Sequence, residues 1–255
     1  MSRIALVTGA SRGIGRATAI RLARDFDGVA IVARSPKQLA ETAEAIRAHD
    51  AEPLILVEDL RRPEASGASV EATLNRFGRL DALVCVAGAV PQLDLFSLSE
   101  EQWTEGLALK FHSARRMTIA AWQALKWSHG SVVLTSGTTA LAPKASLAAV
   151  ATINAAILAL GKAFAERGIG DGIQVNTVLP GAVMTDRRRT MLQSYADAQK
   201  LPLDAAVARF AAEAGIARYG LPEDIAHAVS FLVSPESHWL TGTALRVDGG
   251  ETKVP

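Results

Sequence analysis

The fold of this chain is decided by the stretch Ile4-Ala-Leu-Val-Thr8-Gly-Ala-Ser-Arg-Gly-Ile-Gly15. An apolar run of strand length ends at Thr8, and three glycines then lead directly into an amphipathic helical segment. Glycines at such a turn let backbone amides approach a pyrophosphate at a helix N-terminus, where the dipole and unpaired N–H groups favour an anion. This context favours a dinucleotide-binding loop over the alternative, a tight turn without a ligand.

Short apolar runs alternate with helix-length segments along the rest of the chain. The runs lie at 4–7, 29–33, 54–57, 82–86, 131–134, 173–178 and 244–247. Unbroken runs of this kind, separated by helices, are typical of a parallel sheet covered on both faces. We therefore predict an α/β fold: a single-domain, doubly wound (Rossmann) parallel sheet over 1–255, with about seven strands and helices on both faces.

Local signals support these elements. Ser35-Pro36 places a proline in a first helical turn, Ser99-Glu-Glu-Gln102 matches a capping box, and Pro222-Glu-Asp places acidic groups at a helix start. The segment 145–164 is apolar almost all round, which predicts a helix buried in the core or in a subunit interface. We expect the four tryptophans to be packing residues; they are Trp103, Trp122, Trp127 and Trp239.

Composition excludes several classes of function. The net charge of +1 over 255 residues favours neither nucleic acid nor an anionic membrane as a partner. The single cysteine, Cys85, excludes an internal disulfide framework, and the five scattered histidines make a metal site improbable. The first apolar run is too short for a signal peptide or a membrane span, so we expect a cytoplasmic protein.

The end of the second apolar run predicts the choice of cofactor. An acidic residue there would accept from the ribose 2′-hydroxyl of NAD, but this chain has Val32-Ala33-Arg34-Ser35. Arg34 and Arg12 offer two cations for a 2′-phosphate, which favours NADP(H) over NAD(H). The alternative is that both arginines are solvated surface charges.

Over nearly its whole length the chain resembles the short-chain dehydrogenase/reductase (SDR) superfamily, in particular its ketoacyl reductases. The motifs that carry the resemblance are the glycine loop, Asp59-Leu60, Ala87-Gly88, Pro180-Gly181-Ala-Val183-Met-Thr185, Gly220-Leu-Pro-Glu-Asp224, Leu240-Thr-Gly242 and Asp248-Gly-Gly250. The resemblance implies that Asp59 and Leu60 contact the adenine and that Val183 and Thr185 hold the nicotinamide carboxamide. It also implies a homodimer or homotetramer built on two long helices. The predicted cofactor-binding residues are Gly9, Ser11, Arg12, Gly13, Ile14, Gly15, Arg34, Asp59, Leu60, Ala87, Gly88, Pro180, Gly181, Val183 and Thr185.

The chain departs from the family at the catalytic tetrad. Active members carry Tyr-x-x-x-Lys on one helix face, where the lysine lowers the pKa of the phenol, together with a serine and an asparagine. A gapless alignment from Gly130 to Gly181 puts Val150 at the tyrosine, Asn154 at the lysine and Gly137, beside Ser136, at the serine. Lys110 takes the asparagine position. The chain's two tyrosines, Tyr195 and Tyr219, lie outside this helix, and Lys162 is roughly 12 Å past Asn154 along it.

Two interpretations follow for the function. In the first, the protein is an oxidoreductase for a carbonyl/alcohol pair, and the candidate catalytic residues are Lys110, Ser136 and Asn154. Lys110 and Asn154 would then have exchanged places between neighbouring helices, so that Lys110 reaches the cofactor ribose or the substrate oxygen; otherwise Lys110 extends to the surface or pairs with a carboxylate on its own helix. In the second, Val150 offers no proton and the protein binds its cofactor without turnover, as a redox sensor or a structural subunit.

The segment 186–215 occupies the place of the family's substrate lid. Arg187, Arg188 and Arg189 open it, and they suit either an anionic substrate or a solvated helix face. Tyr195 lies within it and would serve as an acid only if the lid folds over the nicotinamide. The identity of the substrate is not predicted.

Overall fold

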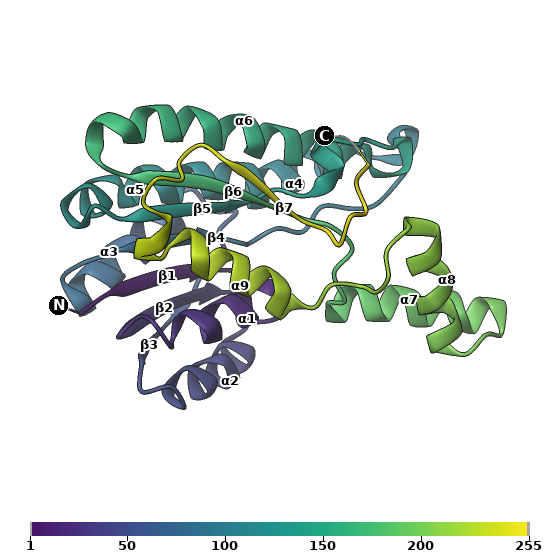
Figure 1. The fold of residues 1–255 in the computed structure, drawn as a ribbon, viewed down its shortest axis with the longest axis horizontal. Helices are drawn as coiled ribbons and strands as arrows, with labels where there is room; N and C mark the ends of the chain where they lie inside the picture. Colours follow the sequence, from purple (N-terminus) through teal and green to yellow (C-terminus); the bar gives the residue numbers. More distant parts are fainter. Residues whose placement is uncertain (1, 254–255) are drawn as a thin grey trace.

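A computed structural model describes residues 2–253 of the chain. Seven parallel strands form one sheet in the order β3-β2-β1-β4-β5-β6-β7, which confirms the predicted doubly wound fold (Figure 1). The strands are β1 (Ile4–Thr8), β2 (Gly28–Ala33), β3 (Glu52–Val57), β4 (Ala82–Cys85), β5 (Ser131–Thr135), β6 (Gln174–Pro180) and β7 (Ala244–Val247).

Helices cover both faces of this sheet. They are α1 (Gly13–Leu22), α2 (Pro36–Arg47), α3 (Ala65–Phe77), α4 (Glu100–Gly106), α5 (Ser113–Ser128), α6 (Ala148–Asp171), α7 (Asp186–Gln199), α8 (Leu203–Ala214) and α9 (Pro222–Leu232). Side chains alternate along β1: Ala5 and Val7 pack with α1, α2 and α9, whereas Ile4 and Leu6 pack with α3, α5 and α6. Two cores therefore enclose the sheet, as its unbroken apolar runs predict.

The strand order changes direction at β1, which pairs with β2 on one side and with β4 on the other. Thr8 lies opposite Cys85 at the carboxyl ends of β1 and β4. Connections that leave a sheet in opposite directions at such a point open a crevice at the carboxyl ends of the strands, and ligands of doubly wound sheets bind there. The glycine loop directly follows β1 at this crevice.

The predicted helix starts are confirmed. The Ser35 hydroxyl accepts from the Gln38 amide before α2, and Pro222 occupies the first turn of α9. Ser99 and Gln102 form the reciprocal capping box of α4. The strand boundaries differ from the sequence patterns by one or two residues: β4 ends at Cys85, and β6 runs from Gln174 to Pro180.

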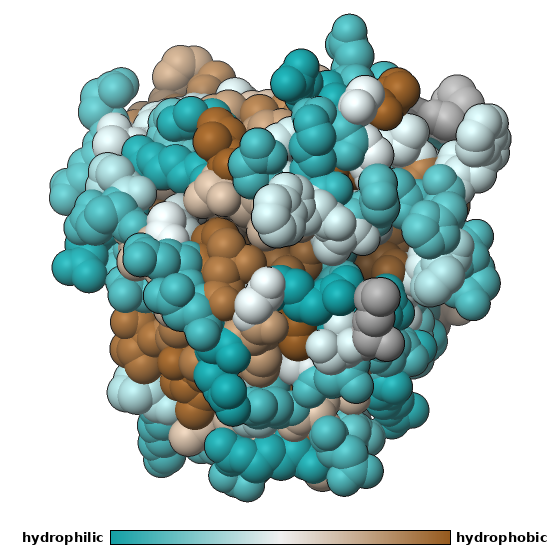
Figure 2. Space-filling model, turned by 90° about the vertical axis from the view of Figure 1, so that its left-hand side faces the viewer, coloured by the Kyte–Doolittle hydropathy of each residue, from teal (hydrophilic) through white to brown (hydrophobic). Residues whose placement is uncertain are grey.

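The packing role predicted for the tryptophans is wrong for two of them. Trp127 is 89% exposed and Trp239 is 97% exposed. Trp127 lies at the end of α5 and Trp239 lies shortly before β7, where the chain turns at the amino ends of the strands. Figure 2 shows this end of the molecule, where brown apolar patches interrupt a hydrophilic surface. Trp103 and Trp122 do pack against apolar neighbours, as predicted.

The long helix α6 is apolar on both its buried and its exposed side. The segment Ala145–Asp171 is long and apolar enough, by length and composition alone, to cross a membrane, but a soluble protein's core helix passes the same test and α6 packs along β6 here. One face, including Ile153 and Ile157, is buried in the core, as predicted, whereas Thr152, Ala155 and Ala159 are exposed. A subunit interface for the exposed face stays a prediction.

Helices α7 and α8 form the segment predicted as a lid and project from the sheet, at the right of Figure 1. They pack on each other through a small apolar cluster around Leu192 and Ala211. The two ends of the segment are joined by a bridge between Val183 and Gly220, and the Met184 amide donates to the Gly220 carbonyl at 2.8 Å. The base of this helix pair is therefore fixed to the body of the protein.

Candidate active site

A cleft of about 430 Å³ opens at the carboxyl ends of β1, β2 and β4. Most of the predicted cofactor-binding residues line it: Gly9, Ser11, Arg12, Gly13, Ile14, Gly15, Arg34, Leu60, Ala87, Gly88 and Thr185. The sequence patterns missed further lining residues, among them Ser35, Gln38, Glu58, Leu109 and Asp186, and Arg187 of the predicted arginine trio lines the cleft as well. The glycine loop therefore forms one wall of a cavity, as a dinucleotide site requires.

The conformation of the glycine loop fits a dinucleotide. Gly9 has a φ of +68°, and a Cβ there would lie 2.9 Å from the Ala87 Cα. A Cβ on Gly15 would lie 2.2 Å from the Gly9 carbonyl oxygen. Arg12 occupies the N-cap of α1 without a capping hydrogen bond, and the first turn holds no acidic residue. The first amides of α1 thus have no side-chain acceptor and are free to bind an anion.

Arg12 and Arg34 both line the cleft, Arg12 in the glycine loop and Arg34 just after β2. Ser35 and Gln38 lie beside Arg34 at the start of α2. These side chains suit a phosphate group on the adenosine half of a dinucleotide, because guanidinium groups bind phosphate oxygens through several charge-assisted hydrogen bonds. Glu58 also lines this part of the cleft.

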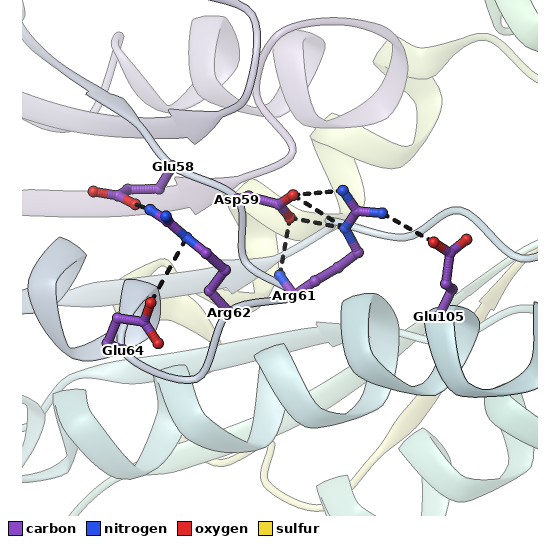
Figure 3. A network of polar contacts seen from close by, with 6 residues as sticks. All are labelled: Glu58, Asp59, Arg61, Arg62, Glu64 and Glu105. Atoms are coloured by element: carbon purple, nitrogen blue, oxygen red, sulfur yellow. Dashed lines mark hydrogen bonds and ion pairs between the residues drawn. The ribbon is translucent and has the colours of Figure 1, made fainter. Parts of the chain in front are cut away.

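Asp59 lies outside this lining, in a network of ion pairs after β3 (Figure 3). Its carboxylate accepts from Arg61, at 2.6 Å from Nη2, and Arg61 also contacts Glu105 of α4 at 3.2 Å. The hydrogen bonds from Arg61 hold the pKa of Asp59 at about 2. The pair ties the end of β3 to α4, and the adenine contact implied for Asp59 stays a prediction.

Three other predicted residues also lie outside the cleft lining. Pro180 ends β6, and a Cβ on Gly181 would meet the Asp248 Cβ at 2.6 Å, so Gly181 faces the C-terminal segment. Val183 is buried in the core on the side of α9. Thr185 does face the cleft, and its hydroxyl caps α7 by accepting from the Arg188 amide.

Lys110 lies in a π-helical turn, Leu107–His112, between α4 and α5, a type of turn that is frequent at functional sites. Its stem passes beneath Gly88, where a Cβ would lie 3.1 Å from the Lys110 Cδ. Its ammonium donates to the Ser136 carbonyl at 3.1 Å and to the Asn154 Oδ1. Burial lowers the pKa of Lys110 to about 8. The side chain neither extends to the surface nor pairs with a carboxylate in the described part of the chain, so that alternative is wrong.

Asn154 connects the ammonium to two further groups. Its side-chain amide donates to the Thr139 hydroxyl at 2.7 Å, and its backbone carbonyl accepts from the Ser136 hydroxyl at 2.7 Å. A Cβ on Gly137 would lie 2.6 Å from the Asn154 Nδ2. The asparagine amide therefore occupies the space of any side chain at Gly137, and the hydroxyl of this region is instead supplied by Thr139. Alignment did not identify Thr139, because it lies two residues from the family's serine position.

Val150 belongs to an apolar cluster on the same helix face as Ile153. Its neighbours include Val90, from the loop after β4, and Trp103. The two tyrosines lie elsewhere: the Tyr195 ring packs on Phe210 within the α7–α8 pair at 4.9 Å between centroids, and Tyr219 is buried. Tyr195 is therefore not placed over the cleft, and no phenol enters the cleft among residues 2–253.

Comparison with known proteins identifies the family. The family model described as enoyl-(acyl carrier protein) reductase matches residues 9–252. The chain belongs to the short-chain dehydrogenase/reductase superfamily. It is 32% identical over 248 residues to the short-chain reductase protein NovJ of Streptomyces niveus, covering 97% of this chain and 93% of the relative. It is 29% identical to the 3-oxoacyl-acyl-carrier-protein reductase FabG of Staphylococcus aureus, covering 98% of each chain.

Solved structures of this SDR superfamily have the same fold. The L-sorbose reductase of Gluconobacter frateurii, complexed with NADPH and L-sorbose, has a TM-score of 0.96 at 26% identity and covers 100% of this chain and 98% of its own. The actinorhodin polyketide ketoreductase with NADPH has a TM-score of 0.91 at 28% identity, covering 99% and 98%. The resemblance stated from the sequence motifs is thereby confirmed, and the protein is an SDR-family oxidoreductase.

Possible metal ligands and the cysteine are the remaining reactive groups in the described part of the SDR chain. Residues 2–253 hold no group of three or more His, Cys, Asp or Glu side chains placed to bind a metal ion. Cys85 is buried beneath the cleft, and burial raises the pKa of its thiol to about 12, so the thiol is inert at neutral pH. The cytoplasmic location expected from the sequence stays a prediction.

Proposed function

We propose that this protein is an NADP(H)-dependent oxidoreductase that interconverts a carbonyl compound and its alcohol, with Lys110 in place of the family's usual acid. The observation that carries the proposal is the half-buried Lys110, whose stem packs against Gly88 of a dinucleotide cleft and whose ammonium donates to Asn154 and the Ser136 carbonyl. A half-buried cation without a carboxylate partner is unfavourable for stability, so its retention at this position indicates a chemical role.

NADP(H) is the cofactor that the cleft favours. Arg12 and Arg34 line the adenosine part of the cleft, and the end of β2 lacks the carboxylate that would accept from the ribose of NAD. The similar L-sorbose reductase and polyketide ketoreductase structures contain NADPH. The bound dinucleotide would supply or accept the hydride, while the protein supplies orientation and the proton.

The protein groups divide these tasks between them. Because the Thr139 hydroxyl accepts from the Asn154 amide, its own hydrogen remains available to donate to a substrate oxygen. Lys110 carries the positive charge and the exchangeable proton, and its lowered pKa keeps an appreciable fraction of both protonation states near neutral pH. Asn154 orients both groups, since its oxygen accepts from Lys110 while its nitrogen donates to Thr139.

A second candidate function is cofactor binding without turnover, as a redox sensor or a structural subunit. The observation that favours it is Val150, which occupies the tyrosine position of the gapless alignment and packs among apolar side chains. In that case the role of Lys110 would be structural: its ammonium would only donate hydrogen bonds to the Asn154 side chain and the Ser136 carbonyl.

Binding and turnover measured on one preparation separate the two candidates. NADPH and NADH are titrated by fluorescence, and a panel of ketones, aldehydes and alcohols is then followed at the nicotinamide absorbance. The proposal predicts preferential NADPH binding and turnover of at least one panel member, lost in Lys110→Met. Preferential NADPH binding with no turnover supports the second candidate, and failure to bind either dinucleotide refutes both.

We also propose that the protein is a homodimer or homotetramer joined through α5 and α6. Ile119 of α5 is 53% exposed and Ile169 of α6 is 71% exposed, so both helices present apolar side chains to solvent. Light scattering coupled to gel filtration checks this proposal: a mass near twice or four times 26.9 kDa is expected, and a monomer would contradict it.

A further inference from the structure

Arg187 is the only member of the arginine trio 187–189 that lines the cleft. Its guanidinium Nη2 donates to the Val90 carbonyl at 3.0 Å, so the side chain crosses from the first turn of α7 to the loop after β4. Arg188 instead lies over the Tyr219 ring at 5.9 Å and contacts the Met191 sulfur. The sequence presents three equivalent arginines, whereas the structure places a single one in the site.

The position of Arg187 is fixed at both ends. The hydroxyl of Thr185 caps α7, and the bridge between Val183 and Gly220 holds the base of the α7–α8 pair. Val90, which accepts from the guanidinium, is itself 6% exposed and packs in the apolar cluster that contains Val150. The guanidinium is thus held at the loop after β4, where Ala89 lines the cleft together with Leu109.

The charge of Arg187 is not neutralised. Within residues 2–253 no carboxylate lies within 4 Å of its guanidinium, and its one recorded acceptor is a neutral carbonyl, which leaves most of its N–H donors free. The other cations of the cleft, Arg12 and Arg34, follow β1 and β2 at the adenosine part. The cleft therefore presents a separate positive charge next to its apolar lining residues Ala89 and Leu109.

We propose that Arg187 binds an anionic group of the substrate, so that the substrates are carbonyl or alcohol compounds with an aliphatic body and a carboxylate or phosphate. This inference rests on the proposed function, because it assigns a substrate class to the same site. The apolar part of the cleft lining nearest this arginine, Ala89 and Leu109, takes the aliphatic body, and the free donors of Arg187 take the anion through charge-assisted hydrogen bonds.

The test compares straight-chain carboxylates, butyrate to octanoate, with the corresponding primary amides, titrated calorimetrically into NADPH-saturated protein. Each pair differs in charge and hardly in shape. Because hydrogen bonds to a charged acceptor are stronger than those to a neutral one, we expect carboxylates to bind at least about 10-fold more tightly than amides. This preference falls to about 1 in Arg187→Ala and persists in the matched control Arg189→Ala. Inorganic phosphate competing with the carboxylate, in wild type but not in Arg187→Ala, places phosphate in the same subsite.

Three outcomes overturn the inference: no carboxylate preference in wild type, a preference that survives in Arg187→Ala, or a loss in Arg187→Ala of NADPH affinity alone. Failure of the proposed function can be distinguished from failure of this inference. If the wild type binds no NADPH, the same carboxylate and amide titrations of the free protein still decide the role of Arg187, because both anchors of its side chain belong to the protein itself.

Discussion

The lowered pKa of Lys110 predicts a measurable dependence of stability on pH. The pKa falls from 10.5 to about 8 on folding. Between these two values the unfolded chain binds a proton that the folded chain does not, so the free energy of unfolding rises with pH in this window. At 1.36 kcal/mol per pKa unit the full window corresponds to about 3 kcal/mol, and the part between pH 7 and pH 9.5 to about 2 kcal/mol.

The variant Lys110→Met removes this titration and keeps most of the side-chain volume. Urea unfolding of wild type and variant at pH 7, 8, 8.75 and 9.5, at one protein concentration, gives the difference between their unfolding free energies. That difference should change by about 2 kcal/mol in favour of the wild type as the pH rises. Other titrations, including that of Cys85, are common to both proteins and cancel.

The exposed Lys144 provides a matched control, because Lys144→Met makes the same substitution outside the hydrogen bonds that join Lys110, Ser136 and Asn154. Its difference from wild type should stay constant over the same pH range. The reasoning about Lys110 is refuted if the Lys110→Met difference is equally constant, because the ammonium would then titrate alike in the folded and unfolded chains. The reasoning is refuted as well if the variant gains unfolding free energy relative to the wild type as the pH rises.

Four further substitutions test the site, two of them combined in one chain. Arg34→Ala should weaken NADPH binding about 10-fold or more and leave NADH binding within about 2-fold, because one charge-assisted contact to the extra phosphate is lost. Equal losses of affinity for both dinucleotides in fluorescence titrations would contradict this prediction. Gly15→Ala places a Cβ 2.2 Å from the Gly9 carbonyl oxygen, so calorimetry should register a lower Tm and no NADPH binding. Gly137→Ala should cost about 1–3 kcal/mol of unfolding free energy through its contact with the Asn154 amide, and Asn154→Ala in the same chain should relieve part of that cost; additive effects would argue against the contact.

The sequence predicted the sheet and the glycine loop because their signals are local. Each unbroken apolar run is short enough to be a single strand, and the glycines before α1 are required by backbone geometry at Gly9 and Gly15. Helix caps such as Ser99 with Gln102 likewise depend on residues three apart. These features need no knowledge of distant contacts.

The remaining site residues depend on tertiary contacts that no local pattern encodes. Thr139 joins the site through the hydrogen bond that it accepts from Asn154, a residue of α6. Arg187 is distinguished from its two neighbouring arginines by its hydrogen bond to the Val90 carbonyl. The exposure of Trp127 could not be read from residue type either, since an aromatic residue packs only where a neighbouring element offers a groove.

Transfer of deuterium from NADPH labelled at nicotinamide C4 tests the central claim most directly. Single-turnover mixtures of the labelled cofactor with a carbonyl panel are analysed by mass spectrometry, for wild type and for Lys110→Met. Because the two C4 hydrogens are not equivalent, each is labelled in turn. We predict an alcohol product one mass unit heavier with one of the two labels in wild type, and its loss in Lys110→Met under NADPH saturation. A wild-type protein that binds NADPH but yields no labelled alcohol, or a variant that yields it at the wild-type rate, would contradict the claim.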